Sequence, residues 1–255
     1  MVLLGFVDLD PDLAALRPLG GFFALRTALP ATAAPHASPP TLAHVYENGS
    51  PDVYGDSMTF RVRKVGDALR APELRIAASV AQQGLAARLW SVALGCAALY
   101  GRIPDLDPRL LHWDPDASAP DDLWLSAVRP LPADAETVTG VVLDGHLRPL
   151  TDHLHARYRV AEGLLWGNAA SALAGAARQL DGWARDHGRT DVAARARART
   201  VELLAHPLLA GAGTLTGTAF RRRSCCLYYR VPGGGVCGDC CFTRPPRSSP
   251  RATSG

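Results

Sequence analysis

The sequence predicts a helix-dominated α+β fold, in which a small antiparallel sheet accompanies the helices and a compact C-terminal cysteine module follows them. Long Ala- and Leu-rich segments with apolar residues at helical spacing indicate the helices. Two short, partly β-branched segments are typical of strands. Five of the six cysteines lie between Ser224 and Phe242. With 255 residues, 47% of them hydrophobic, the chain can bury a core without disulfide bonds.

Four segments are expected to be helical. They are residues 8–29, bent or broken at Pro18 and Gly20-Gly21; residues 72–100, with Gly84 as a candidate break; residues 150–187, in one or two pieces; and residues 191–206, capped by Thr190 or Asp191. The uncharged stretch 163–177 is rich in Ala and Gly and is too short to cross a bilayer. It is therefore interpreted as a buried, closely packed helix.

The remaining segments are expected to be strands, turns and connectors. Residues 123–128 and 137–143 are predicted to pair as antiparallel strands, followed by a turn at 144–145. Residues 31–40 indicate an irregular connector, residues 48–51 a turn, and residues 211–217 a flexible hinge. The expected organisation is a helix-rich domain over residues 1–215, a cysteine module over 216–243 and a disordered tail over 244–255.

Charge and composition narrow the function classes. The net charge of +3 is too small to indicate nucleic-acid or membrane binding, and no basic helix with stacking aromatics accompanies Arg221, Arg222 and Arg223. These arginines are interpreted either as an electrostatic partner of an anionic centre or as a solvated basic turn. No export signal is recognised, so we expect a cytoplasmic protein. In that reducing compartment, clustered cysteines favour metal binding over disulfides.

The cysteines follow the pattern CC-x10-C-x2-C, formed by Cys225, Cys226, Cys237 and Cys240, with Cys241 directly after it. Cys237 to Cys240 is a CxxC turn, which commonly aims two thiolates at one metal. The Gly-rich residues 232–235 between the two cysteine pairs can fold closely over an inorganic core. The spacing leaves three chemistries open. An iron–sulfur cluster is favoured. A structural zinc site is disfavoured, because the two adjacent cysteines of the first pair reach one small ion only with strain. A redox dithiol is disfavoured, because its CxxC motif normally opens a helix in a βαβ unit.

Other candidate residues have structural interpretations. Cys96 is expected in the core, and His153 and His155 point apart on a helix, so they do not chelate one ion. Tyr228 and Tyr229 are expected to pack rather than to shield a metal centre. Four tryptophans are expected in the core, with a ligand pocket as the alternative: Trp90, Trp113, Trp124 and Trp166. No nucleotide or flavin fingerprint is present.

The cysteine pattern resembles the signature of FhuF-type ferric-siderophore reductases of the actinobacterial type. The resemblance extends to the stretches AARLWSVALGCAALYGRIPDL, LLHW, LLWGNAASALAGAARQL and FRRRSCCLYYRVPGGGVCGDC, and covers most of residues 70–243. Residues 1–65 match more loosely and the tail does not match. The four-cysteine spacing is specific, whereas the Ala-rich helices are much less so.

The resemblance implies that Cys225, Cys226, Cys237 and Cys240 ligate a [2Fe–2S] cluster, while Cys241 lies outside the pattern and is given no ligand role. It implies a siderophore-binding reductase domain over 1–215 that passes electrons to chelated Fe(III) and releases Fe(II) in the cytoplasm. No catalytic residue beyond the cluster ligands is implied. The implied partners are a ferric siderophore, expected to be of the hydroxamate type, an unidentified electron donor protein and, peripherally, an inner-membrane siderophore importer.

Two other functions stay open at this point. One is a zinc- or cluster-stabilised protein that binds a siderophore or a partner without redox turnover. The other is an accessory in siderophore biosynthesis, whose helical domain binds a chelate without reducing it.

Overall fold

The computed structural model of the chain describes residues 13–27, 39–47 and 56–246. The predictions for residues 8–12, 28–38 and 48–51 and for the tail beyond residue 246 lie outside these ranges. The helices are η1 (Arg17–Leu19), α2 (Leu42–Glu47), α3 (Ser57–Leu69), α4 (Leu74–Tyr100), α5 (Ala135–Thr139), η2 (Gly140–Leu147), α6 (Arg148–Tyr158), α7 (Glu162–Asp186), α8 (Thr190–Leu204), α9 (Pro207–Ala210) and η3 (Tyr228–Arg230). Within the described ranges, no helix combines the length and hydrophobicity that a bilayer span requires.

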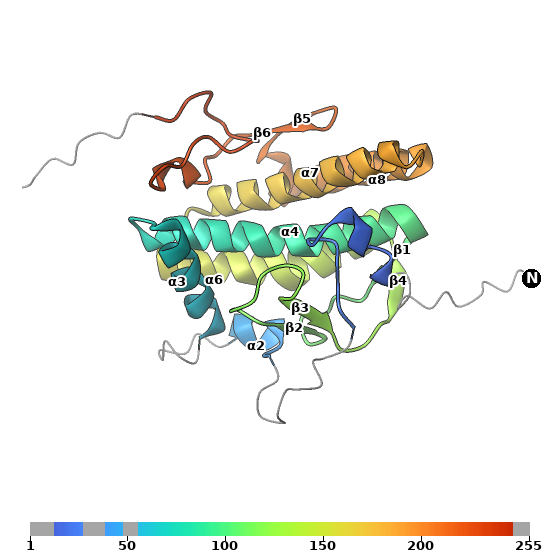
Figure 1. The fold of residues 1–255 in the computed structure, drawn as a ribbon, viewed down its shortest axis with the longest axis horizontal. Coiled ribbons are helices and arrows are strands. Elements are labelled where there is room, and N and C mark those ends of the chain that lie inside the picture. Colours follow the sequence, from blue (N-terminus) through green and yellow to red (C-terminus); the bar gives the residue numbers. More distant parts are fainter. Residues whose placement is uncertain (1–12, 28–38, 48–55, 247–255) are drawn as a thin grey trace, which may run out of the picture.

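The strands form short two-stranded antiparallel ribbons, and the fold is the expected helix-dominated α+β type with a C-terminal cysteine segment. The strands are β1 (Arg102–Pro104), β2 (Leu111–Trp113), β3 (Leu123–Leu125), β4 (Pro130–Pro132), β5 (Gly213–Thr216) and β6 (Ala219–Arg222). They pair as β1 with β4, β2 with β3 and β5 with β6. Figure 1 shows the β5–β6 ribbon and the cysteine segment on one side of the helices.

Helix α4 is the centre of the bundle, with α7, α8, α3 and α6 around it (Figure 1). It is one continuous helix, so the candidate break at Gly84 is wrong. A glycine inside a helix costs only about 1 kcal/mol relative to alanine, and the burial of most of α4 exceeds that. At Gly95, an added Cβ would come within 2.9 Å of the Phe23 ring, so the N-terminal segment packs directly on the α4 backbone.

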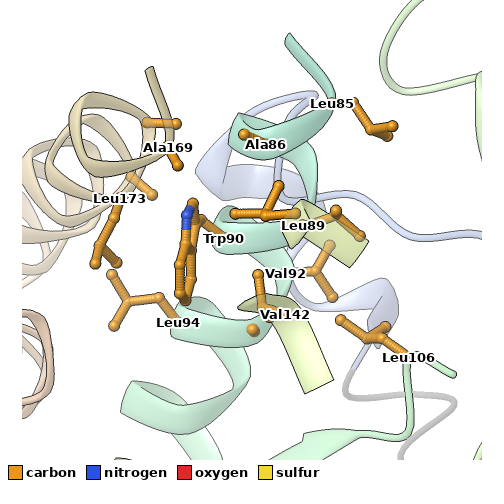
Figure 2. Close-up of a cluster of buried hydrophobic side chains, with 14 of the residues drawn as sticks. Leu85, Ala86, Leu89, Trp90, Val92, Leu94, Leu106, Val142, Ala169 and Leu173 are labelled. Carbon is orange, nitrogen blue, oxygen red and sulfur yellow. The ribbon is translucent and has the colours of Figure 1, made fainter. Parts of the chain in front are cut away.

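The core between α4 and α7 is built around Trp90. Figure 2 shows its indole facing Ala169 and Leu173 of α7, while Val92 of α4 lies on the side toward Val142 and Leu106. All of these side chains are buried. Alanines on α7 let the large indole fit between two close helices, which confirms the expected core position of Trp90 and the buried helix over residues 163–177.

Residues 137–143 are helical, so their prediction as a strand paired with residues 123–128 is wrong. Leu123–Leu125 does form a strand, but its partner is Leu111–Trp113. The cause is an N-cap: Asp134 accepts hydrogen bonds from the backbone N–H and the hydroxyl of Thr137, both at 2.8 Å. Buried Val138, Val142 and Leu147 then follow at helical spacing, and this packing overrides the β-propensity of valine.

The predicted turn at 144–145 lies inside η2, a π-helical stretch between α5 and α6. It carries His146 into the core, where Nε2–H donates to the Leu106 carbonyl at 2.6 Å and Nδ1 accepts from the Tyr46 hydroxyl at 2.9 Å. Burial lowers the pKa of His146 to about 4. The neutral imidazole therefore joins η2 to segments that are distant in the sequence.

Three further expectations are corrected. Of the helix expected over residues 8–29, the described part forms only a short turn and η1, and Arg26 forms a β-bridge with Trp124 of β3. Helix α8 begins after Arg189, which is its N-cap. Most of the hinge expected over residues 211–217 is strand β5. Glycine suits position 213 because the Phe220 ring leaves no space for a side chain there.

A buried ion pair fixes the N-terminal segment to α4. The Arg88 guanidinium donates to Asp122 at 2.9 Å, and their side chains are 1% and 6% exposed. The same guanidinium donates to the carbonyls of Gly21 and Phe22 at 2.9 and 2.6 Å. One cation thus joins α4, the β3 segment and residues 13–27.

We predict that Arg88→Met lowers the free energy of unfolding by about 3–5 kcal/mol, because it leaves the Asp122 carboxylate buried without its partner. Urea unfolding monitored by circular dichroism measures this loss. Arg148→Met is the control, since it breaks a half-exposed pair with Asp144 and should change stability by less than about 1 kcal/mol. Equal losses in the two variants would contradict the role given to Arg88.

Candidate metal centre

The cysteine segment follows β6 as a series of tight turns. Leu227 takes a left-handed conformation (φ 69°) directly after the first cysteine pair, and Gly233 takes another (φ 72°) in the Gly-rich loop. At Gly234 a Cβ would overlap the Tyr228 carbonyl oxygen and lie 2.9 Å from that of Val231. The second cysteine pair closes a turn in which the Cys240 N–H donates to the Cys237 carbonyl at 3.0 Å. These turns bring the two cysteine pairs together.

The five sulfurs form two groups. The first group contains Cys225, Cys240 and Cys241, whose Sγ atoms lie within 4.8 Å of one another. Among the described His, Cys, Asp and Glu residues, these three lie close enough together to bind one metal ion. Cys226 and Cys237 form the second group, with their sulfurs 3.6 Å apart. All are free thiols. The structure therefore divides the four predicted ligands between two sulfur groups and places Cys241, which the spacing pattern left out, in the group of Cys225 and Cys240.

Backbone N–H groups point at two of the sulfurs. The N–H of Leu227 donates to Cys225 Sγ at 3.3 Å, and that of Phe242 donates to Cys240 Sγ at 3.4 Å. Such bonds favour thiolates and tune the potential of a bound cluster. Each donor lies two residues after the cysteine whose sulfur it contacts.

The thiol pKa values differ within the site. The pKa of Cys226 is lowered to about 6, mainly by its hydrogen bond with Cys237, and the same bond raises the pKa of Cys237. Burial raises the pKa of Cys225 to about 11 and also raises that of Cys241. Without metal, Cys226 is therefore the member of its pair that ionises, and the Arg222 guanidinium is among the groups that stabilise its thiolate.

Arg222 is a buried cation that has no carboxylate partner among the described residues. It is 2% exposed, donates through Nη2 to Asn168 and to the Leu164 carbonyl, and leaves Nε and Nη1 without acceptors. Its charge favours the thiolate forms of Cys226, Cys237 and Cys241, although the bond with Cys226 leaves the pKa of Cys237 raised and burial leaves that of Cys241 raised. An unpaired buried guanidinium is costly. An anionic group bound to the cysteines would compensate this cation.

The cysteine segment docks on α4 and α7 through buried polar side chains. Ser79 donates to the Cys226 carbonyl at 2.8 Å and accepts from Asn168 at 3.0 Å. Ser171 donates to the Asp239 carboxylate at 2.6 Å, and Arg178 lies 3.2 Å from the same carboxylate. Sequence reasoning missed these supports. The signal was present as lone polar residues, Asn168 and Ser171, inside an otherwise apolar stretch.

The other candidates from the sequence have structural roles. Cys96 is fully buried, as expected. His155 Nδ1 bonds to the Val160 carbonyl, and no metal group in the described ranges includes His153 or His155. Tyr229 stacks edge-on against Phe242, and Tyr228 is exposed. The remaining tryptophans, Trp113, Trp124 and Trp166, belong to the core or pack against it.

Comparison with known families decides the class of centre. A model of the FhuF-like ferric iron reductase transporter family matches residues 76–213, and a model of the FhuF 2Fe–2S C-terminal domain matches residues 222–242. The chain belongs to the FhuF family. No curated protein matches it. As in the FhuF C-terminal domain, the cofactor is a [2Fe–2S] cluster, and the all-thiolate donors beside the uncompensated Arg222 fit an anionic cluster of this kind.

In this FhuF family member we predict that Gly234→Ala lowers cluster content, because its Cβ overlaps the Tyr228 and Val231 carbonyls and shifts the loop between the cysteine pairs. Iron and acid-labile sulfide assays on purified protein measure the loss. Gly235→Ala is the matched control, since nothing lies within 4 Å of its Cβ. Full cluster content in Gly234→Ala would contradict the loop geometry.

We also predict that Arg222→Met weakens cluster retention about 10- to 100-fold under chelator challenge, the usual scale for a group that supports metal ligands. The unfolding free energy of the apo-protein should change by less, about 1 kcal/mol, because removal of the unpaired cation offsets the lost bond to Asn168. Arg223→Met, at an exposed neighbour, is the control. A large loss of apo stability with normal cluster retention would make Arg222 purely structural.

Proposed function

We propose that this protein is a ferric-siderophore reductase that passes single electrons from its cluster to chelated Fe(III) and releases Fe(II) in the cytoplasm. The observation that carries the proposal is the sulfur geometry within a FhuF family chain. Cys226 Sγ lies 3.6 Å from Cys237 Sγ, and Cys225 Sγ lies within 4.8 Å of those of Cys240 and Cys241, so each sulfur group joins a cysteine of the first pair to one of the second. A [2Fe–2S] cluster needs two thiolates at each iron.

We assign Cys225, Cys226, Cys237 and Cys240 as the ligands, one cross-segment pair for each iron. Cys241 lies beside Cys225 and Cys240 and is assigned no ligand role. Residues 216–243 then act as the cluster-binding module and residues 1–215 as the chelate-binding domain. The cluster supplies one electron at a time at low potential, roughly −400 mV for plant-type all-thiolate centres.

The remaining residues bind, orient and stabilise. Arg222 offsets negative charge at the cysteines, and the N–H groups of Leu227 and Phe242 hold two sulfurs in place. Reduction alone releases the iron from the siderophore, because hard oxygen ligands hold Fe(III) far more tightly than Fe(II). No proton transfer to the siderophore backbone and no bond cleavage is needed. The electron comes from a separate donor protein, and the ferric chelate, of the hydroxamate type, is delivered by an inner-membrane importer.

The cysteine assignment predicts that Ser at any of the four ligand positions removes most of the iron and sulfide, whereas Cys241→Ser keeps about two of each per chain. Anaerobic purification with iron, sulfide and visible absorption measurements checks this. In the wild type, dithionite should bleach the visible bands and a ferric trihydroxamate should restore them, with Fe(II) captured by a chromogenic chelator.

Three outcomes would contradict parts of this proposal. A colourless protein with one zinc would overturn the cluster assignment and leave a structural site. A cluster that stays bleached when the ferric chelate is added would keep the metal centre but exclude the reductase activity, which is the outcome expected of a binding protein without redox turnover. Loss of the cluster in Cys241→Ser would move the second cross-segment pair to Cys225 and Cys241.

A further inference from the structure

A hollow of about 320 Å³ lies between α4 and α7, directly beside the CxxC turn. We call it the α4–α7 hollow. Its floor is made of small residues on the facing helices, Ala87 on α4 and Ala172, Gly175 and Ala176 on α7. The three α7 residues share one helical face. In the core, Trp90 of α4 lies against α7 (Figure 2), whereas the α4 residues that line the hollow are the smaller Gln83, Ala87 and Ser91.

One wall of the hollow belongs to the cluster-binding segment. This wall consists of Cys237, Gly238 and Asp239, so one of the proposed cluster ligands borders the hollow. Gly238 has no side chain, and nothing lies within 4 Å of where its Cβ would be. A molecule in the hollow would therefore lie against the CxxC turn, next to a proposed ligand residue and a peptide that carries no side chain. Electron transfer requires this kind of close approach.

The charge of the hollow indicates what it can hold. Its charged lining residues are Arg178 and Asp239, which lie 3.2 Å apart and neutralise one another, and Ser171 also donates to Asp239. The other polar groups are neutral hydrogen-bonding side chains, among them Gln83 and Ser91. Phe22, with 42% of its surface exposed, supplies an aromatic wall. Such a lining suits an uncharged, oxygen-rich, amphipathic molecule.

We propose that the α4–α7 hollow is the docking site for the ferric chelate and selects chelates with no net charge. Three hydroxamate monoanions cancel the charge of Fe(III), whereas three catecholate dianions leave a trianion, for which the hollow offers no free cation among the described residues. One electron passes from the reduced protein to the docked Fe(III), which becomes Fe(II), while the protein returns to its oxidised form and is reduced again by the donor protein. The redox step rests on the proposed function; the docking site does not.

The test fills the hollow without disturbing the fold. Gly175→Leu adds a side chain where a Cβ meets only the Arg178 guanidinium, at 4.0 Å. Gly182→Leu is the matched control, the same change on the same helix with nothing within 4 Å and outside the hollow. The probe is a gallium(III) trihydroxamate, a redox-inert neutral analogue, titrated into the oxidised holo-protein. We expect at least tenfold weaker binding in Gly175→Leu, and unchanged binding in Gly182→Leu.

The rate of reduction of the matching ferric trihydroxamate should likewise fall in Gly175→Leu and stay unchanged in Gly182→Leu. Cluster content, reduction potential and reoxidation by ferricyanide should stay unchanged in both variants. Gallium(III) tris-catecholate should bind the wild type at least tenfold more weakly than the neutral chelate. If Gly175→Leu does not fold, Ala87→Leu replaces it in the test, because this change fills the hollow from α4.

The outcomes separate the two proposals. Equal binding by wild type and Gly175→Leu, or no binding by the wild type, overturns the docking site. Tighter binding of the trianion overturns the charge selection. Normal gallium-chelate binding that Gly175→Leu abolishes, without reduction of the ferric chelate, supports the docking site and contradicts the reductase.

Discussion

The buried guanidinium of Arg222 is the interaction on which the cysteine centre depends. It lies at the end of β6, where the chain leaves the ribbon for the first cysteine pair, and it bonds to Asn168 in the N-terminal third of α7. A charge in this position is unfavourable by itself, because two of its nitrogens, Nε and Nη1, have no hydrogen-bond acceptor. It becomes favourable when thiolates and a bound anionic cluster lie beside it. The arginine therefore couples the docking of the cysteine segment to the occupancy of the metal centre.

This coupling explains why the helices that carry the segment contain polar residues. Ser79 and Asn168 form a hydrogen-bonded chain from α4 through α7 to the Cys226 carbonyl and to Arg222. Each group in this chain is buried and has a partner, so the chain fixes one position of the segment on the helices. A cluster held at this position has a defined distance from the α4–α7 hollow, as electron transfer to a docked molecule requires.

Much of this arrangement could be predicted from local patterns. The Ala/Leu periodicity located α4, α7 and α8, and the cysteine spacing located the metal centre, because both signals arise within one stretch of chain. Residues 137–143 could not be predicted this way. Their valines favour a strand locally, and only the Asp134 cap and the burial of Val138 and Val142 against distant elements make them helical. The contact of Cys241 with Cys225 likewise depends on how the turns fold back.

The α4–α7 hollow is a second feature that the local sequence does not predict. Residues 163–177 indicate a closely packed helix, and around Ala169 and Leu173 this is what the structure has, because Trp90 fills the space opposite. On the neighbouring face of α7, Ala172, Gly175 and Ala176 line the hollow together with Ala87 of α4, and small residues on both helices leave a cavity. The sequence of α7 alone cannot distinguish these cases, since the difference lies on α4. The same run of small residues thus packs the core on one face of α7 and leaves room for a ligand on the next, beside the CxxC turn.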